Sequence, residues 1–251
     1  MSYEKTQKGN PHELTIYQHH FPAASIARFA GSDGCVEVHL IPQNKEVRLK
    51  PEDQLFSARR VWDQRAESGY MKEIEDKYQE LATAVVAGVI TSINGEHQSI
   101  ITDMFALWYI RGLRRANPIS DQKIEGVIGL GRDYSKDDRE KLEKNHISII
   151  RPDLTVPGRH LCSANIQLNL FQVSELMPDA HWGILRAKSG HFIVPDNFSN
   201  ARILPLSPLI CFFSQSDDDE IEESEVAEIN RMAIEASRSY YLANELAKCP
   251  R

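Results

Sequence analysis

The first part of the chain alternates between apolar and polar residues. Residues 36–40 follow the period-two pattern of a half-buried β-strand. Residues 47–49 can return beside that strand as a hairpin, because the turn-forming residues Pro42-Gln43-Asn44 lie between the two segments. Before the hairpin, residues 1–14 form a polar lead-in, and residues 16–30 predict a short helix or turn.

Helical periodicity dominates the middle of the chain. Apolar residues recur every three or four positions from Met71 to Val89, which predicts a helix that ends at Asn94-Gly95. A second series, from Ile101 to Leu113, predicts a helix that stops near Asn117-Pro118.

A more polar region follows these two helices. Residues 120–146 predict shorter helices, and Ser135 followed by Asp138 resembles a helix start. Residues 147–158 are extended and contain prolines. Residues 160–176 are compatible with either helix or strand, and the helix is favoured.

The C-terminal part contains apolar, strand-like runs and a final helix. The runs are Trp182–Arg186, His191–Val194 and Arg202–Phe213. The acidic stretch Asp217–Glu223 comes next and complements the positive N-terminal end of a helix. One face of that last helix is expected to carry Val226, Ile229, Ala233, Ser237 and Tyr240.

These elements together predict one α+β domain over residues 1–251. We expect a central helical segment between an N-terminal hairpin region and a C-terminal antiparallel sheet, closed by the C-terminal helix. A chain of 251 residues can bury a substantial core. We expect the three tryptophans, Trp62, Trp108 and Trp182, to lie in that core.

The formal net charge of −7 argues against a mainly electrostatic grip on nucleic acid. A nucleic-acid partner is therefore expected only through a local cleft. The densest basic spots, Arg59-Arg60, Arg114-Arg115 and Arg111, are expected to be solvated faces or ion pairs. A protein partner or a homo-oligomer stays open as an alternative.

The start of the chain and the cysteines bear on the compartment. Residues 1–10 are polar, without the apolar stretch of a signal peptide, and no apolar run approaches the roughly 18 residues of a membrane span. The four cysteines are far apart and form no C-x-x-C pair. We expect a cytoplasmic protein with reduced thiols and no membrane partner.

Several short motifs resemble, in the same order along the chain, those of one known protein family. His19 and Pro22 give a His-x-x-Pro element, followed by Ile26-Ala27-Arg28-Phe29, and either His19 or His20 can be the family's histidine. Phe192 to Asn197 resembles a second family block, with Pro195 in place of the usual serine. Pro205-Leu206-Ser207-Pro208 and the last helix resemble the family's ending. With these motifs in this order, the chain resembles the DUF4238 family. The resemblance covers nearly the whole chain and implies a fold, since the family has no settled activity.

Two charged residues lie at the margin of the apolar helical stripes. Glu75 adjoins Ile74 on the first helix, and Arg111 lies three residues after Trp108 on the second. A charge placed there is costly unless it is paired. If the helices pack antiparallel, the two groups can meet, either as a structural ion pair or as part of a site.

A second set of polar residues comes from both ends of the chain. His20, or its neighbour His19, can act as a general acid or base, and Asp196 with Asn197 directly follows an apolar strand. The alternative is structural: the histidine bonds a nearby carbonyl, and Asp196-Asn197 makes an Asx turn. Asn230 interrupts the apolar face of the last helix and is expected to anchor it to backbone groups.

Two classes of function follow from these residues. One is a hydrolase, in its narrowest form a nuclease of a bacterial toxin or phage-defence system, with His20, Glu75, Arg111, Asp196 and Asn197 as the candidate catalytic residues. The histidine would be the base and Arg111 would hold an anionic group such as a phosphate. Asp196 or Glu75 would orient the histidine or bind a divalent cation, the candidate cofactor. The other class is a non-enzymatic regulatory or interaction protein.

Overall fold

The computed structural model describes residues 4–126, 132–175, 177, 180–197 and 202–251. The helices are α1 (Ala23–Ala27), α2 (Gln64–Ser68), α3 (Tyr70–Val86), α4 (Gly95–Ala116), α5 (Lys136–Lys144), α6 (Gly158–Glu175) and α7 (Glu223–Ala236), with short 3-10 turns at η1 (Gln54–Phe56) and η2 (Leu246–Lys248). The strands are β1 (Tyr17–His19), β2 (Val36–Leu40), β3 (Lys45–Leu49), β4 (Ser57–Arg59), β5 (Gln122–Lys123), β6 (Thr155–Val156), β7 (Trp182–Ala187), β8 (Val194–Pro195), β9 (Ile203–Ser207), β10 (Ile210–Ser214), β11 (Asp219–Ile221) and β12 (Tyr240–Ala243).

The fold is α+β, with two four-stranded sheets. One sheet has the order β11-β7-β10-β9, in which β11 runs parallel to β7 and the other pairs are antiparallel. The other sheet has the order β3-β2-β12-β8 and is antiparallel throughout. The predicted N-terminal hairpin therefore forms, but it pairs with the last strand of the chain.

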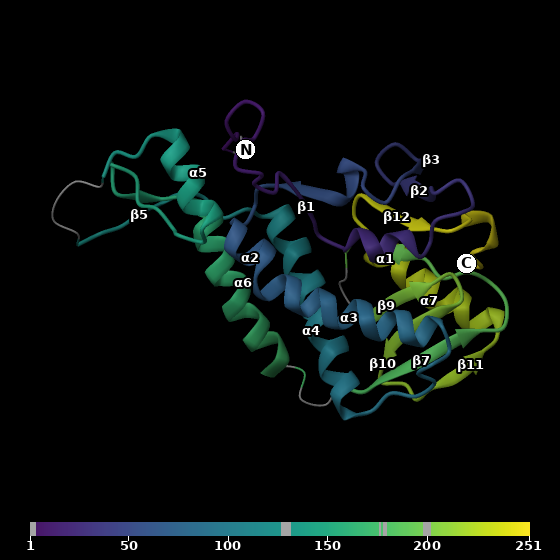
Figure 1. Cartoon of the computed structure of the whole chain (residues 1–251). Coiled ribbons are helices and arrows are strands. Elements are labelled where there is room, and N and C mark those ends of the chain that lie inside the picture. The colour runs from purple at the N-terminus through teal and green to yellow at the C-terminus, as the bar shows by residue number, and fades with distance from the viewer. Residues whose placement is uncertain (1–3, 127–131, 176, 178–179, 198–201) are drawn as a thin grey trace.

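Helices pack between the sheets and a smaller region at the far end of the molecule. Figure 1 shows α3 and α4 in the middle with α6 along the lower left edge, the two sheets with α7 on one side, and α5 with β5 on the other. The main core joins both sheets to α3 and α4, and Trp108 and Trp182 lie within it. Trp62 lies in a second core between α2, α4 and α6. All three tryptophans are buried, as expected.

The prediction for the end of the first long helix was wrong. Gly88 adopts φ +73°, the left-handed conformation that ends many helices, so α3 stops at Val86. Asn94 instead caps the start of α4: its side chain accepts a hydrogen bond from His97 N at 2.9 Å, and Asn94 N donates to His97 Nδ1 at 3.3 Å. The predicted end of α4 near Asn117 is confirmed.

The middle region follows its predictions in part. Ser135 caps α5, as predicted, and residues 158–175 form α6, which settles the ambiguity in favour of helix. Residues 127–131 and 176 of these predicted segments lie outside the described residues.

The C-terminal predictions need three corrections. The run Arg202–Phe213 divides into β9 and β10 around a turn at Pro208-Leu209. Only Val194 of the run His191–Val194 joins a sheet, as the first residue of β8. The last helix ends at Ala236, so Ser237 and Tyr240 leave the helical face.

Tyr240 begins β12, which the sequence analysis did not predict. The acidic stretch before α7 also has two roles, since part of it forms β11 and Glu222 caps the helix in a capping box with Glu225.

Candidate functional site

A pocket lies where α4 ends, beside the antiparallel strands β8 and β12. Its volume is about 210 Å³. The end of β8 and the start of β12 both adjoin the pocket, because the two strands are antiparallel and Leu242 pairs with Val194 and Tyr241 with Pro195. This pairing brings the residues after β8 next to the residues before β12. The lining residues are Gly112, Arg115, Ala116, Asp196, Asn197, Arg238 and Ser239.

Asp196 and Asn197, two of the predicted site residues, line this pocket and also hold its walls together. The Asp196 carboxylate accepts hydrogen bonds from Arg238 N at 2.8 Å and Ser239 N at 2.9 Å. Asn197 Nδ2 donates to Ala236 O at 3.2 Å. These bonds fasten the link between α7 and β12. They cross to residues far along the chain, where the structural alternative had placed a local Asx turn.

His20 lies behind the pocket wall in closed surroundings. Its side chain is fully buried, and Nδ1 donates to Phe56 O at 2.8 Å, since a carbonyl can only accept. Nε2 is then the acceptor for Tyr240 Oη at 3.1 Å and Arg115 Nη1 at 3.3 Å. Burial and the neighbouring Arg115 charge hold the pKa of His20 well below its usual value, so the ring is neutral.

These contacts correct the expected role of His20. We expected a general base, but both ring nitrogens are engaged and the ring does not reach the pocket. The geometry favours a positioning role, in which His20 fixes the Arg115 side chain. The alternative histidine, His19, is half-buried and Nε2 lies 3.3 Å from Pro51 O. Burial lowers the pKa of His19 as well.

Two arginines of this pocket were not among the predicted site residues: Arg115 was expected to belong to a solvated face or an ion pair, and Arg238 was not singled out. Arg115 Nη2 also donates to Leu55 O at 2.8 Å, which holds the guanidinium at the pocket wall. Arg238 is exposed and lines the pocket. The spacing of Arg115, one helical turn after Arg111, could have shown that both lie on one face of the same helix.

Glu75 and Arg111 meet, as the antiparallel packing of α3 and α4 predicts. They form an ion pair in which the Arg111 side chain is 1% exposed and the Glu75 side chain 24%. The Arg111 guanidinium also lies over the Trp62 ring, 5.4 Å from its centroid. Burial raises the pKa of the adjacent Glu67 despite the Arg111 charge.

Arg111 is therefore committed to the interior and does not line the pocket. Arg111 was expected to hold an anionic group, but its guanidinium pairs with Glu75 instead. The arginine of α4 that lines the pocket is Arg115. Among the described residues, no group of three or more His, Cys, Asp or Glu side chains is placed to hold a metal ion.

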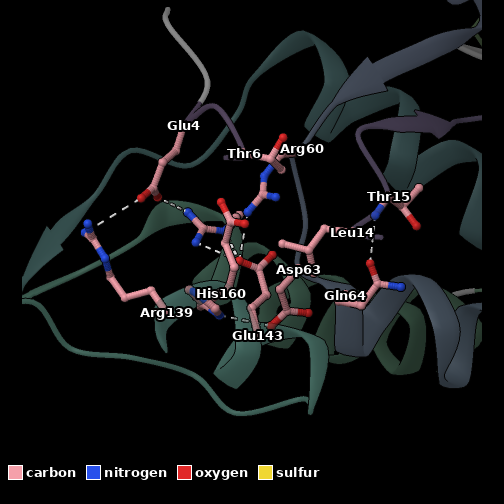
Figure 2. A network of polar contacts seen from close by, with 12 residues as sticks. Glu4, Thr6, Leu14, Thr15, Arg60, Asp63, Gln64, Arg139, Glu143 and His160 are labelled. Carbon is pink, nitrogen blue, oxygen red and sulfur yellow. Dashed lines mark hydrogen bonds and ion pairs between the residues drawn. The ribbon is translucent and has the colours of Figure 1, made fainter. Parts of the chain in front are cut away.

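A separate polar network joins the N-terminal lead-in to α5 and α6 (Figure 2). Glu143 Oε2 accepts hydrogen bonds from Arg60 Nη2 at 2.8 Å, Arg159 Nε at 3.0 Å and Arg159 Nη2 at 2.8 Å. Glu4 pairs with Arg159 and Arg151 from the other side. The network is largely buried and fixes the lead-in against the helices.

Asp63 lies at the edge of that network. Its carboxylate accepts from Ser163 Oγ at 2.6 Å and lies 3.3 Å from His160 Nδ1. Burial alone would raise the pKa of Asp63, but the hydrogen bonds from His160, Ser163 and Ala66 N outweigh it and leave the pKa lowered. Ser163 is fully buried, so a substrate cannot reach its hydroxyl in this structure.

Comparison of the chain with known proteins identifies no relative. No helix in the described part of the chain is long and apolar enough to cross a membrane. The chain matches no family model, no curated protein and no solved structure, so the resemblance to the DUF4238 family stays a prediction.

Proposed function

We propose that the pocket at the end of α4 binds a phosphate group and that the protein hydrolyses a phosphate ester held there. The observation that carries the proposal is that Arg115 and Arg238 both line one small pocket. Two guanidinium groups against the one carboxylate of Asp196 leave a net positive charge in a chain whose net charge is −7. Guanidinium groups recognise phosphate oxygens by paired, charge-assisted hydrogen bonds.

The size of the pocket limits what can enter it. A volume of about 210 Å³ is below the range of about 300–1,000 Å³ usual for drug-sized ligands. We therefore propose that a single phosphate group enters, while the rest of the substrate stays outside. A nuclease of a toxin or phage-defence system is the narrower form of this proposal, with one phosphodiester reaching the pocket.

Hydrolysis requires a proton acceptor beside the phosphate. Each oxygen of Asp196 accepts one backbone N–H and has a second lone pair free for a water molecule. In the proposed reaction, a water oxygen attacks phosphorus and its proton passes to Asp196. The bond from phosphorus to the leaving oxygen breaks, and that oxygen takes a proton from solvent.

A second candidate is a regulatory protein that binds the phosphate group without turnover. The closed surroundings of His20 favour it, because the histidine that the sequence offered as a base holds Arg115 in place instead. Both candidates predict binding, and they differ only in turnover.

Binding and turnover can be measured with matched arginine variants. Arg238 and Arg231 are both exposed, but only Arg238 lines the pocket. We expect Arg238→Ala to weaken binding of inorganic phosphate and AMP by about 10- to 100-fold in calorimetry, because a hydrogen bond to a charged group contributes about 1.5–3 kcal/mol. Arg231→Ala should bind like the wild type.

Turnover of p-nitrophenyl phosphate and of a short RNA, with and without Mg²⁺ or Mn²⁺, separates the candidates. Hydrolysis that is lost in Arg238→Ala and kept in Arg231→Ala supports the hydrolase. Binding with no hydrolysis of either substrate supports the regulator. Equal phosphate affinity in wild type and Arg238→Ala would remove both.

A further inference from the structure

The exposed face of α6 is unusually apolar for a surface helix. Leu168 is 65% exposed and Phe171 is 69% exposed. Ala164 is exposed and Leu161 partly so. These four residues follow one another at steps of three, four and three, which places them in one stripe along the helix.

The opposite face of α6 is already used. Cys162 and Ile166 are fully buried and belong to the core that α6 shares with α4. In Figure 1, α6 runs along the edge of the molecule with α4 beside it. The helix therefore has two apolar faces, and the described structure covers only one of them.

Charged residues occur only near the two ends of this helix, at Arg159 and Glu175. From residue 160 to residue 174 the sequence contains no Asp, Glu, Lys or Arg, whereas these make up 26% of the whole chain. The polar residues that flank the stripe are the amides Asn165, Gln167, Asn169 and Gln172. Asn169 Nδ2 donates to Asn165 within the helix, whereas Gln167 and Gln172 are exposed. Amides both donate and accept hydrogen bonds, so these two can pair with the same face of a second copy.

We propose that this stripe, Leu161, Ala164, Leu168 and Phe171, is the interface through which two copies of the chain form a dimer. Two molecules of net charge −7 repel each other, and a face without charges is where they can meet without placing like charges together. A strongly basic or acidic partner would find no opposite charge on this stripe.

Side-chain sizes favour an antiparallel arrangement of the two helices. A two-fold axis close to Leu168 places Ala164 of one copy opposite Phe171 of the other, so a small residue faces a large one twice. The same axis brings Leu168 beside its own symmetry mate. The stripe is only about 15 Å long at 1.5 Å per residue, so we expect a dissociation constant in the micromolar range.

Sedimentation equilibrium of the full chain at about 1 to 200 µM tests the proposal. The wild type should change from 28.5 kDa towards twice that mass as its concentration rises. Phe171→Glu should stay at the monomer mass over the whole range, because the dimer would bury two carboxylates. Val89, 79% exposed and outside the stripe, supplies the control: Val89→Glu should associate like the wild type.

A charge-swap pair distinguishes the interface from a folding defect. Leu168→Glu and Leu168→Lys should each be monomeric and fold normally by circular dichroism. When mixed, they should form a dimer, since the two-fold axis places position 168 of one copy beside position 168 of the other. A wild type that stays monomeric at 200 µM, or a Phe171→Glu variant that still dimerises, would overturn the proposal.

Discussion

Replacing Glu143 by glutamine should destabilise the protein by about 3 kcal/mol. The Arg60, Glu143 and Arg159 side chains are only 3%, 4% and 7% exposed. Breaking a buried ion pair from one side costs about 3–5 kcal/mol, because the remaining charge stays buried without its partner. Arg159 keeps its ion pair with Glu4, so Arg60 is the main residue left without a partner. We therefore expect a loss at the lower end of this range. The Nε and Nη1 atoms of Arg60 already lack a hydrogen-bond partner among the described residues.

Urea unfolding followed by tryptophan fluorescence measures the effect. A loss of about 3 kcal/mol corresponds to about 6–12 °C in Tm for a chain of this length. Asp76→Asn is the control, because the Lys72–Asp76 pair is 58% exposed on both sides and should contribute at most about 1 kcal/mol. The double variant Arg60→Met with Glu143→Met should recover much of the loss, since no unpaired charge remains. If Glu143→Gln costs no more than Asp76→Asn, the buried network is not the reason that the lead-in is held in place.

Three further predictions concern the core and the pH dependence of stability. Asn230→Ala should cost about 3 kcal/mol in urea unfolding, because its buried amide bonds one backbone N–H and two backbone carbonyls, and a Tm within 2 °C of wild type would contradict this. Burial and the Arg115 charge lower the pKa of His20, so the unfolded chain binds a proton at higher pH than the folded chain. The contribution of His20 to stability should be complete above about pH 6.5 and be lost as pH falls, by up to about 1.4 kcal/mol per pH unit. The free energy of unfolding, measured from pH 7.5 to 5.5, should therefore depend less on pH in His20→Gln than in the wild type. Gly183→Ala should cost about 1–3 kcal/mol, because the added Cβ would lie 2.3 Å from Asp217 O, and equal Cm values for variant and wild type would refute it.

Local features of the sequence predicted the elements whose causes are themselves local. The alternation of residues 36–40 gives a strand, and Ser135 caps the helix that follows it. Asn230 was predicted to anchor its helix because a buried amide needs partners, and its bonds to the backbone near residues 191, 193 and 250 confirm it. The Glu75–Arg111 pair could be foreseen because both charges border apolar stripes on neighbouring helices.

Errors arose where a residue type serves two kinds of local structure. Asn94-Gly95 is compatible with the end of one helix or the start of the next, and the left-handed Gly88 decides between them. Tyr240 fits the helical spacing of α7, but Ser237 has already turned to extended backbone with ψ 140°. Tyr240 and the residues after it pair with β2 and β8 instead. The backbone hydrogen bonds of this sheet replace those of a further helical turn.

The sequence by itself determined that the long helices, the hairpin and the buried tryptophans exist, because periodicity and capping act within a few residues. Tertiary structure alone decided that the hairpin pairs with β12, that Asp196 lies in one pocket with Arg115, and that His20 is sealed behind that pocket. These outcomes depend on strand order and helix packing between segments that are far apart in the chain, such as those of Arg115 and Asp196. A pattern along the chain carries no information on which of several compatible apolar faces will meet, so the role of each polar residue becomes visible only when its neighbours in space are known.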